Sequence, residues 1–234
     1  MSQSSESTRR SAVFAKEPLP GQVKTRLEPV LGAVGAAELQ TSMIEDLLDL
    51  HQAAGAPLGL AVHPVEAVER MRAAFPMAAE VVAQQGADLG ERLAHWFESG
   101  PTGHTQVVLG ADCPFVEASL VARAHELLEQ GADAVFAPDG GGGYCLVGMR
   151  VPAPGLFEGV PMSTENNLVS TLDEAQRLGL AVQLLPVRGD VDTPVDLPRL
   201  QRDLNTAADR KDAHYPARTA ATLARLLECT PSSL

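Results

Sequence analysis

A segment just after the first apolar run of the chain carries an unusual density of positive charge. Its cations and its hydroxyl group, all within eleven residues, belong to Lys16, Lys24, Arg26 and Thr25. A polyphosphate needs several fixed donors of high positive density, and an arginine can bind one through two hydrogen bonds. Pro20 and Gly21 stiffen and turn the same segment. We expect it to bind the phosphates of a nucleotide; the alternative is a basic loop that is simply exposed.

Acidic residues follow two later apolar runs. Asp112 lies just beyond Gln106–Leu109, where a carboxylate can face a ligand or serve only as a turn or helix-capping residue. Asp190 and Asp192 lie in an extended segment, and we expect only one of them to point into the site. The residues that follow fit a helix start, Thr193, Pro194 and Asp196. Oxygen ligands from Asp112 and one of the two aspartates would suit Mg²⁺ or Mn²⁺.

Four consecutive glycines, Gly140–Gly143, separate two expected strands and are preceded by Asp139. Such a run favours neither a helix nor a strand interior. It would let the backbone approach a ligand closely, and it would equally suit a flexible hairpin turn. Both interpretations remain open at this point.

The composition is that of a folded protein with an uneven distribution of charge. Among 234 residues, 18 are Lys or Arg and 30 are Asp or Glu, so the formal net charge is −12; 45% are hydrophobic. This argues against a disordered chain and against a nucleic-acid-binding surface, which needs a basic face. No apolar run reaches the ~18 residues that a membrane span needs.

The first ten residues lack the apolar stretch of a secretory signal. We expect them to form a disordered tail that includes Arg9 and Arg10. The three cysteines match no disulfide or metal framework, so we expect reduced thiols and a cytoplasmic location. Cys113 is expected to be a small packed residue rather than a nucleophile.

Short apolar runs alternate with helical periodicity from residue 11 onward. The expected strands are Ser11–Ala15, Leu58–Val62, Glu80–Ala83, Gln106–Leu109, Asp133–Ala137, Tyr144–Met149 and Leu180–Pro186. The expected helices are Ala33–His51, Val65–Phe75, Asp88–Phe97, Ala118–Gln130, Thr164–Leu178, Pro194–Leu204 and Ala217–Leu227. The alternation predicts a single α/β domain over residues 11–228, with a mostly parallel sheet flanked by helices. Ligands bind such sheets beyond the carboxyl ends of the strands, where the segments described above lie.

Common nucleotide-binding and catalytic motifs are missing from the sequence. Val23 stands where a P-loop needs glycine before Lys24-Thr25, and no Gly-x-Gly-x-x-Gly follows the first expected strand. There is no Gly-x-Ser-x-Gly elbow, and the histidines lack metal-ligand spacing. The combination of the separate loops therefore predicts the site, which would hold a metal and a polyphosphate.

Several motifs resemble those of the rSAM/selenodomain-associated transferase 1 family. The segment Phe14–Leu27 resembles the family signature F-A-K-x-P-x-P-G-x-V-K-T-R-L. Shorter matches in the same order are Gln85–Arg92, Gly110–Pro114, Gly142–Tyr144, Ser163–Thr164 and Asp190–Pro194. Together they cover about residues 12–200. The resemblance implies a Rossmann-like GT-A (nucleotide-diphospho-sugar transferase) fold, whose other members include guanylyltransferases.

The resemblance also implies roles for individual residues. Asp112 and Asp192 would hold the metal, and the phosphates would be bound by Lys16, Lys24 and Arg26. The acceptor would be bound by Gly142, Gly143, Tyr144 and Ser163, although Ser163 could instead cap the helix that follows it. One position departs from the family pattern, since Gly141 stands where the family usually has an aspartate and the nearest acid is Asp139.

The leading hypothesis is a metal-dependent transferase that moves a nucleotidyl group from an NTP to a small phosphorylated or anionic acceptor. Lys24 and Arg26 would offset charge on the phosphates, and Asp112 would position the metal. The alternative is a glycosyltransferase that uses a nucleotide-diphospho-sugar donor. A second alternative, suggested by Gly141, is a non-catalytic nucleotide-binding module. The sequence leaves open the base, the acceptor and whether the protein forms a homodimer.

Overall fold

A computed structural model describes residues 9–153, 155–162 and 164–228. Its strands are β1 (Arg9–Lys16), β2 (Gly59–His63), β3 (Val81–Ala83), β4 (Thr105–Gly110), β5 (Ala134–Pro138), β6 (Tyr144–Met149) and β7 (Val182–Leu184). Its α-helices are α1 (Glu28–Ala53), α2 (Val68–Ala74), α3 (Leu89–Ser99), α4 (Ala118–Glu129), α5 (Asn167–Arg177), α6 (Leu197–Arg210) and α7 (Ala217–Glu228). Short 3-10 turns precede three of the helices, η1 (Thr25–Leu27), η2 (Val65–Ala67) and η3 (Pro194–Asp196). The alternation of strands and helices predicted from the sequence is confirmed.

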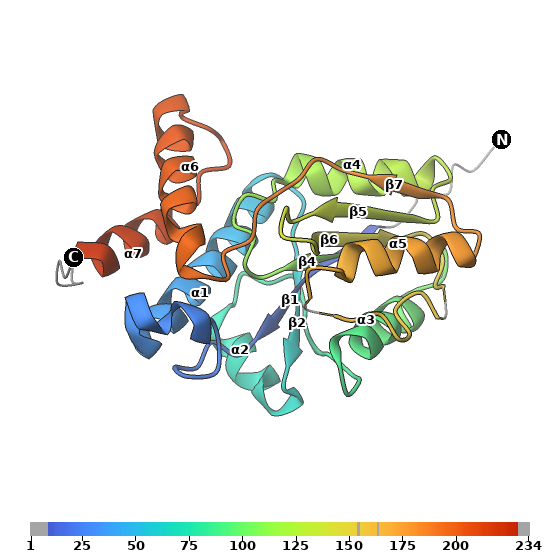
Figure 1. Cartoon of the computed structure of the whole chain (residues 1–234), viewed down its shortest axis with the longest axis horizontal. Helices are drawn as coiled ribbons and strands as arrows, with labels where there is room; N and C mark the ends of the chain where they lie inside the picture. Colours follow the sequence, from blue (N-terminus) through green and yellow to red (C-terminus); the bar gives the residue numbers. More distant parts are fainter. Residues whose placement is uncertain (1–8, 154, 163, 229–234) are drawn as a thin grey trace.

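One seven-stranded sheet in the order β3-β2-β1-β4-β6-β5-β7 runs through the molecule (Figure 1). Neighbouring strands are parallel except where β6 meets β4 and β5. β6 runs against β5 because only residues 139–143 separate the two strands, and parallel strands need a longer crossover. The predicted mostly parallel sheet is therefore confirmed. Both edge strands, β3 and β7, are only three residues long.

Alternating side chains of the central strand β1 enter two separate cores. Val13 and Ala15 pack in the core shared with α1, α2 and α4, whereas Ala12 packs in the core with α3 and α5. Phe14, two positions after Ala12 on the same face of β1, packs edge to face against the ring of Trp96 on α3, with 5.7 Å between the ring centroids. Helices therefore cover both faces of the sheet (Figure 1). None of the helices described here has the length and apolar character that crossing a bilayer requires.

A third core joins the two C-terminal helices to α1, beside the sheet (Figure 1). Leu39 and Met43 of α1 pack there with Leu200 of α6 and Leu223 of α7. The buried carboxylate of Asp46 on α1 accepts two backbone N–H groups at the start of α7, at 3.1 and 2.7 Å. These bonds satisfy donors that have no partner within a helix, and a negative charge is favourable at that end.

The expectation of a disordered tail over residues 1–10 is wrong at Arg9 and Arg10. Residues 1–8 lie outside the described structure, but Arg9 and Arg10 belong to β1 and pair with the first residues of β4. The Arg9 guanidinium lies 2.8 Å from Glu129, and that of Arg10 lies 3.0 Å from Glu80 and 3.7 Å from the Trp96 ring centroid. Strand pairing and ion pairs thus extend β1 into a polar segment that has no hydrophobic signal of its own.

The first helix is longer than the periodicity predicts. It begins at Glu28 rather than at residue 33 and continues past His51. Gly32 lies within it with φ 69° and ψ 162°, so the backbone bends there instead of following a regular helix. The apolar period therefore becomes regular only after this bend, which explains why the sequence pattern places the start too late.

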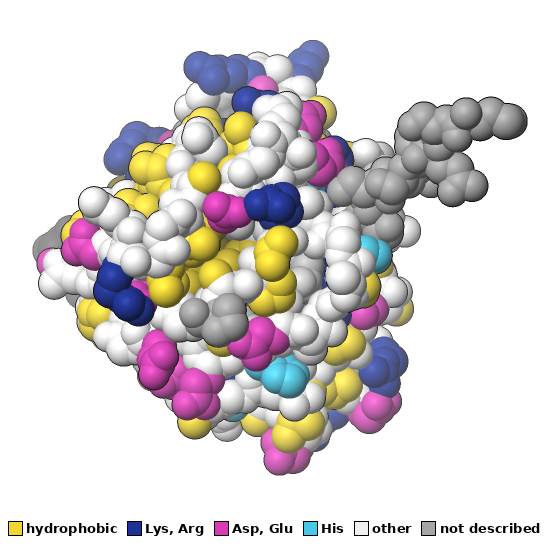
Figure 2. Space-filling model, turned by 90° about the vertical axis from the view of Figure 1, so that its right-hand side faces the viewer, with side chains coloured by type: hydrophobic (Ala, Val, Ile, Leu, Met, Phe, Trp, Pro, Cys, Tyr) yellow, Lys and Arg dark blue, Asp and Glu magenta, His cyan; other side chains and the backbone are white. Residues whose placement is uncertain are grey.

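Charged and apolar side chains are interspersed on the face of the molecule that Figure 2 shows. Basic side chains on this face are dispersed among acidic and hydrophobic ones rather than gathered into one field. A mixed surface of this kind is ordinary for a solvated protein.

A buried histidine connects β1, β4 and α4. His125 is only 2% exposed, and its two ring nitrogens are hydrogen-bonded to the hydroxyls of Ser11 and Thr105 at 2.8 and 2.7 Å. Burial, together with the charge of Arg9, lowers the pKa of His125 to about 4. The folded protein therefore holds this ring in its neutral form at pH 7.

We expect the free energy of unfolding to fall between pH 6.5 and pH 4, because the unfolded chain binds a proton that the buried His125 ring resists. A folded-state pKa of about 4 against the ordinary 6.5 corresponds to a loss of up to ~3 kcal/mol from this residue. Chemical denaturation across this pH range measures the loss. His125→Gln should flatten the pH dependence, whereas His104→Gln, at a partly exposed position, should not; equal slopes in the two variants would contradict the prediction.

Candidate active site

The chain diverges at the carboxyl ends of β1 and β4, two adjacent central strands. After β1 it leads to β2 and β3 on one side, and after β4 it leads to the strands on the other side. Such a divergence leaves a crevice outside the strand ends, where α/β sheets bind ligands. A cavity of about 580 Å³ lies there, lined by the segments that follow β1, β4 and β5.

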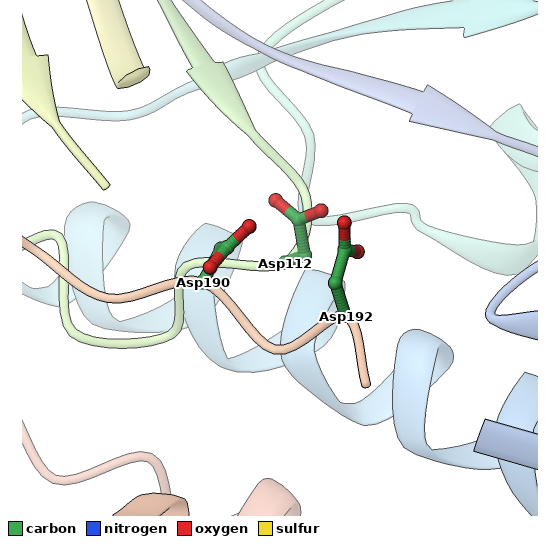
Figure 3. A group of neighbouring side chains, drawn as sticks. All are labelled: Asp112, Asp190 and Asp192. Atoms are coloured by element: carbon green, nitrogen blue, oxygen red, sulfur yellow. The ribbon is translucent and has the colours of Figure 1, made fainter. Parts of the chain in front are cut away.

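Three aspartates converge on this cavity (Figure 3). One carboxylate oxygen from each of Asp112, Asp190 and Asp192 lies within 4.8 Å of the others. The expectation that only one of Asp190 and Asp192 points into the site is wrong. The two residues are two positions apart, and an extended chain places side chains i and i+2 on the same face. Val191 between them points the other way and is 1% exposed.

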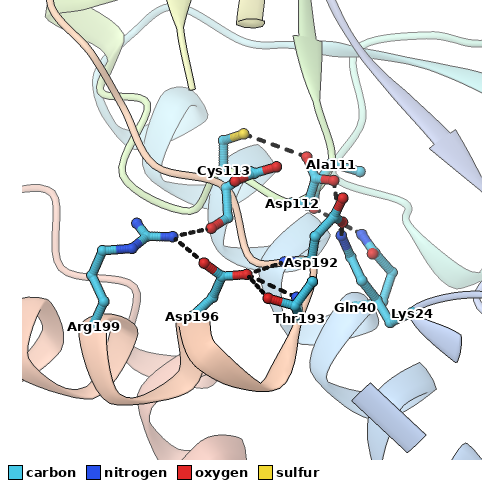
Figure 4. A network of polar contacts seen from close by, with 10 residues as sticks. Lys24, Gln40, Ala111, Asp112, Cys113, Asp192, Thr193, Asp196 and Arg199 are labelled. Carbon is cyan, nitrogen blue, oxygen red and sulfur yellow. Dashed lines mark hydrogen bonds and ion pairs between the residues drawn. The ribbon is translucent and has the colours of Figure 1, made fainter. Parts of the chain in front are cut away.

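Lys24 lies between two of these carboxylates (Figure 4). Its ammonium nitrogen is 2.8 Å from Asp112 Oδ2 and 2.5 Å from Asp192 Oδ1, and its side chain is only 6% exposed. Burial acts to lower the pKa of Lys24, but the two carboxylates outweigh it and raise that pKa above its ordinary value. Burial likewise acts to raise the pKa of Asp112, but the Lys24 ammonium holds it below its usual range.

Asp190 experiences the excess of negative charge most strongly. Burial raises its pKa to about 7, and the charges of Asp112, Asp192 and Asp139 act in the same direction. The ammonium of Lys24 opposes this change but is outweighed. Carboxylates thus outnumber the one buried ammonium among them, so the cluster keeps a net negative charge that favours a cation of higher charge.

The two loops that carry the aspartates are tied to each other and to neighbouring helices (Figure 4). The backbone N–H of Val191 donates to the carbonyl of Asp112 at 3.0 Å. The amide of Gln40 on α1 donates to the carbonyl of Ala111 at 2.8 Å. Arg199 of α6 donates to the carbonyl of Asp190. Hydrogen bonds to the backbone of both loops therefore fix the positions from which the carboxylates project.

The predicted helix start after Asp192 is confirmed. Thr193 and Asp196 form a capping box at the start of η3, with Pro194 in its first turn. Asp196 also accepts the backbone N–H groups of Asp192 and Thr193, at 3.1 and 2.8 Å. This carboxylate is therefore used for structure, which leaves Asp190 and Asp192 to face the cavity.

The four-glycine loop forms a hairpin that packs tightly against the chain before α5. Gly142 has φ +97°, and a Cβ added there would lie 2.0 Å from the carbonyl oxygen of Glu165. Asp139 accepts the backbone N–H groups of Gly141 and Gly143 at 2.6 and 3.0 Å, and it also lines the cavity. The four glycines thus form the expected hairpin turn between β5 and β6. The backbone of Gly142 lies close to Glu165 of the same chain.

Most of the predicted phosphate-binding residues line the cavity, namely Lys16, Lys24, Thr25 and Arg26. Pro20 and Gly21 are not among the lining residues in the described part of the chain; they lie on the exposed turn of the loop. Of the predicted acceptor residues, Gly143 and Tyr144 line the cavity, and Gly142 packs behind it. Ser163 lies outside the described residues.

Several polar residues that line the cavity are not predicted from the sequence, among them Gln22, Gln40 and Asn167. Gln40 could have been found, because a glutamine on the buried face of a helix needs a polar partner. Gln22 and Asn167 give no comparable signal, since exposed loops and helix starts contain such residues routinely.

The prediction that Cys113 is a packed residue rather than a nucleophile agrees with its burial. Its side chain is 1% exposed. A hydrogen bond with Cys145, together with burial, raises the pKa of its thiol, which therefore stays protonated at neutral pH. A protonated thiol is a poor nucleophile.

The donor set fits a hard divalent cation. Asp112, Asp190 and Asp192 offer only carboxylate oxygens, the ligands that Mg²⁺ and Mn²⁺ prefer. The excess negative charge around Asp190 is a second observation in favour of such an ion. Among the described residues, the cluster of possible metal ligands contains only these three aspartates, without a sulfur or imidazole ligand that would favour zinc or copper.

The fold and the site define a Rossmann-like protein with a cavity that contains charged side chains at the divergence of its sheet, and similarity to known proteins agrees with this class. Residues 47–164 match the family model described as "Uncharacterized protein conserved in bacteria (DUF2064)". This match spans half of the chain, and the protein belongs to the DUF2064 family. No curated protein matches the chain.

Solved structures resemble the protein over most of its length. A crystal structure from Desulfovibrio desulfuricans G20, provisionally named a nucleotide-diphospho-sugar transferase, is 32% identical, with a TM-score of 0.78. The similarity covers 94% of this chain and 97% of the other. The fold thus belongs to the GT-A-like class that the sequence motifs imply.

More distant structures share the fold alone. Molybdopterin-guanine dinucleotide biosynthesis protein A from Archaeoglobus fulgidus is 17% identical, with a TM-score of 0.57 over 84% of this chain and 99% of the other. The 4-diphosphocytidyl-2C-methyl-D-erythritol synthase from Anaerococcus prevotii is 9% identical, with a TM-score of 0.52 over 86% and 100%.

We expect Gly142→Ala to destabilise the protein by ~2 kcal/mol or more, because the new Cβ would meet the Glu165 carbonyl and the backbone has positive φ. Gly141→Ala is the matched control: it has no positive φ, and its added Cβ would lie 3.5 Å from the nearest atom, Asp139 Oδ1. Urea denaturation measures both variants, and a similar loss in both would show that the close packing at Gly142 is unimportant.

Proposed function

We propose that this protein is a divalent-metal-dependent transferase acting on an activated nucleotide. The proposed reaction moves a nucleotidyl group from an NTP to a small phosphorylated or anionic acceptor. The observation that carries the proposal is the meeting of two opposite charge clusters in one cavity. Lys16, Lys24 and Arg26 line the cavity together with the aspartates at positions 112, 190 and 192.

Both clusters are needed to bind a polyphosphate beside so many carboxylates. A triphosphate brought near three aspartates alone would be repelled, because the charges have the same sign. Asp112, Asp190 and Asp192 would hold Mg²⁺ or Mn²⁺. A bound ion of this kind supplies positive charge and Lewis acidity to the phosphate oxygens.

The cationic loop would bind and orient the phosphates from the other side of the cavity. Arg26 offers paired N–H donors, Thr25 a hydroxyl, and Lys16 and Lys24 ammonium groups. Fixed donors of this kind stabilise charge that develops on the phosphates during transfer. An acceptor oxygen attacks the α-phosphorus, the bond from that phosphorus to the bridging oxygen breaks, and pyrophosphate leaves with the electron pair.

The side of the cavity formed by β6 and the glycine hairpin would receive the acceptor. Tyr144 and Gly143 line this side. Ser163 is a proposed acceptor residue because of the motif in which it stands. Asp139 also lines the cavity, so it supplies a carboxylate close to position 141, where the family that the motifs resemble usually has an aspartate. This supports a catalytic role over a non-catalytic binding module.

Glycosyl transfer from a nucleotide-diphospho-sugar is the second candidate. One observation favours it: the 32% identical relative from Desulfovibrio desulfuricans carries the name of such a transferase. The same residues would then stabilise a departing nucleoside diphosphate. The motif resemblance to the rSAM/selenodomain-associated transferase 1 family is compatible with either reaction.

The two reactions differ in their products. Each NTP and each nucleotide sugar is incubated with Mg²⁺ and a panel of sugar phosphates and short carboxylic acids. Release of pyrophosphate would support nucleotidyl transfer, and release of a free nucleoside diphosphate from a nucleotide sugar would support glycosyl transfer. Formation of neither product with any pair would contradict both proposals.

A nucleotide that the protein uses should raise its free energy of unfolding. At 100 times the dissociation constant, the expected increase is ~2.7 kcal/mol, because ligand binds the folded state alone. A thermal-shift panel of NTPs and nucleotide sugars, each with and without Mg²⁺, measures this effect. We expect a larger shift with Mg²⁺, and the absence of any nucleotide-dependent shift would contradict a nucleotide site.

Asp112→Asn should reduce transfer at least ~100-fold and abolish the Mg²⁺-dependent part of the thermal shift. The substitution removes a charged ligand with little change in size, and even residues that only support a metal ligand contribute about 10- to 100-fold. Initial rates and melting curves measure the two effects. Glu98→Gln, at an exposed position of α3 outside the cavity lining, is the charge-matched control and should retain both. Wild-type rates in Asp112→Asn would exclude this carboxylate from the mechanism.

A further inference from the structure

The ammonium group of Lys24 occupies the place of a bound cation. It contacts Asp112 Oδ2 and Asp192 Oδ1, and these two residues also belong to the cluster suited to a divalent ion. Lys24 is one of only three lysines in the chain; the others, Lys16 and Lys211, are exposed. An ammonium is a compact point charge, so it fits between carboxylates as a metal ion would.

The backbone at Lys24 places its side chain among the carboxylates. Lys24 has φ 48° and ψ 37°, a left-handed conformation that is uncommon for a residue with a Cβ. The loop is anchored on both sides: Glu17 pairs with Arg70 through two hydrogen bonds of 2.6 and 2.7 Å, and Leu27 is fully buried. Residues 19–22 between these anchors are exposed. The loop thus has fixed ends and an exposed middle.

We propose that Lys24 is a placeholder cation that must leave the aspartate cluster before a divalent metal can be bound there, and that it then moves onto the phosphates of the nucleotide. The proposal rests on the function proposed above and adds regulation of the same site. Lys24 would hold the aspartates together while metal and nucleotide are absent. It would also make metal loading dependent on the arrival of a polyphosphate.

The two cations exclude one another for a simple geometric reason. Mg²⁺ binds carboxylate oxygens at about 2.0–2.1 Å. Oxygens of Asp112 and Asp192 that already lie 2.8 and 2.5 Å from the ammonium nitrogen would have to accept a second cation beside the first. Two positive charges so close together repel strongly, so the ammonium and the metal compete for the same two carboxylates.

Competition of this kind makes the affinity for the metal depend on whether the nucleotide is bound, and the reverse. A polyphosphate that draws Lys24 away frees two carboxylates for the metal, and a bound metal frees the ammonium for the phosphates. Each ligand therefore raises the affinity for the other by the same factor. The nucleotide-free protein should accordingly bind metal weakly, despite its three aspartates.

The first test measures Mn²⁺ binding to the nucleotide-free protein by electron paramagnetic resonance of the free ion. We expect Lys24→Met to bind Mn²⁺ at least ten-fold more tightly than the wild type, because the competing ammonium is gone. Lys16→Met is the matched control: it also removes one positive charge from the cavity lining, and no ion pair joins Lys16 to the aspartates in the described structure. An equal gain in both variants, or no gain in Lys24→Met, would overturn the proposal.

The second test uses the wild-type protein and does not depend on the stability of a variant. A proton–nitrogen correlation spectrum of the lysine ammonium groups should show one protected resonance, because two of the three lysines are exposed and exchange rapidly with water. Saturating Mg²⁺ should remove this resonance or shift it to the position of an exposed lysine. Persistence of the protected resonance at saturating Mg²⁺ would overturn the proposal.

A third measurement separates failure of this inference from failure of the proposed function. Asp112→Asn in the Lys24→Met background should return Mn²⁺ binding to a weak level. If Mn²⁺ binding in Lys24→Met is insensitive to Asp112→Asn, the ion binds elsewhere and the metal site itself is wrong. If binding depends on Asp112 but not on Lys24, the metal site stands and only the placeholder role is overturned.

Discussion

The two ion pairs of Lys24 connect three parts of the protein that are far apart in the chain. Asp112 and Asp192 lie 88 and 168 positions beyond the lysine. A buried ammonium without a partner is costly, and clustered carboxylates without a cation repel one another. The loop after β1, the loop after β4 and the segment before α6 are therefore mutually dependent. Removing the ammonium would leave the carboxylates to repel one another, and removing Asp112 or Asp192 would take one ion pair from the buried ammonium.

The architecture makes this meeting possible. β1 and β4 are adjacent and parallel, so their carboxyl ends open at the same edge of the sheet. The chain then crosses to the far strands and returns through Asp190 and Asp192, where Val191 hydrogen-bonds to the loop after β4. The C-terminal helices pack on α1, whose Gln40 supports that same loop. The core around α1 thus links the position of the returning segment to the position of the carboxylates.

Hydrophobic periodicity predicts the order and type of the strands and helices, because each has a buried face of regular spacing. Periodicity fails where interactions other than hydrophobic burial determine the structure. Arg9 and Arg10 join β1 through strand pairing and ion pairs. The first helix begins before Ala33 and is bent at Gly32. The candidate site was predictable as a set of loops at strand ends. The partners of Lys24 were not, because no spacing rule relates charges separated by more than 80 residues. The orientation of Asp190 follows from the extended backbone, in which positions i and i+2 share a face, so the expectation that only one of the two aspartates faces the site is wrong.

The edges of the sheet determine how copies of this protein can associate. An unpaired strand edge is a template on which another chain can add a strand, and its capacity grows with its length. Here β3 and β7 each expose an edge only three residues long. A sheet that continues from one molecule into another is therefore disfavoured. An unfolded chain likewise has few backbone groups on these edges to which it can hydrogen-bond. Contacts between copies that use side chains of the helical layers would leave the strands that position the site undisturbed.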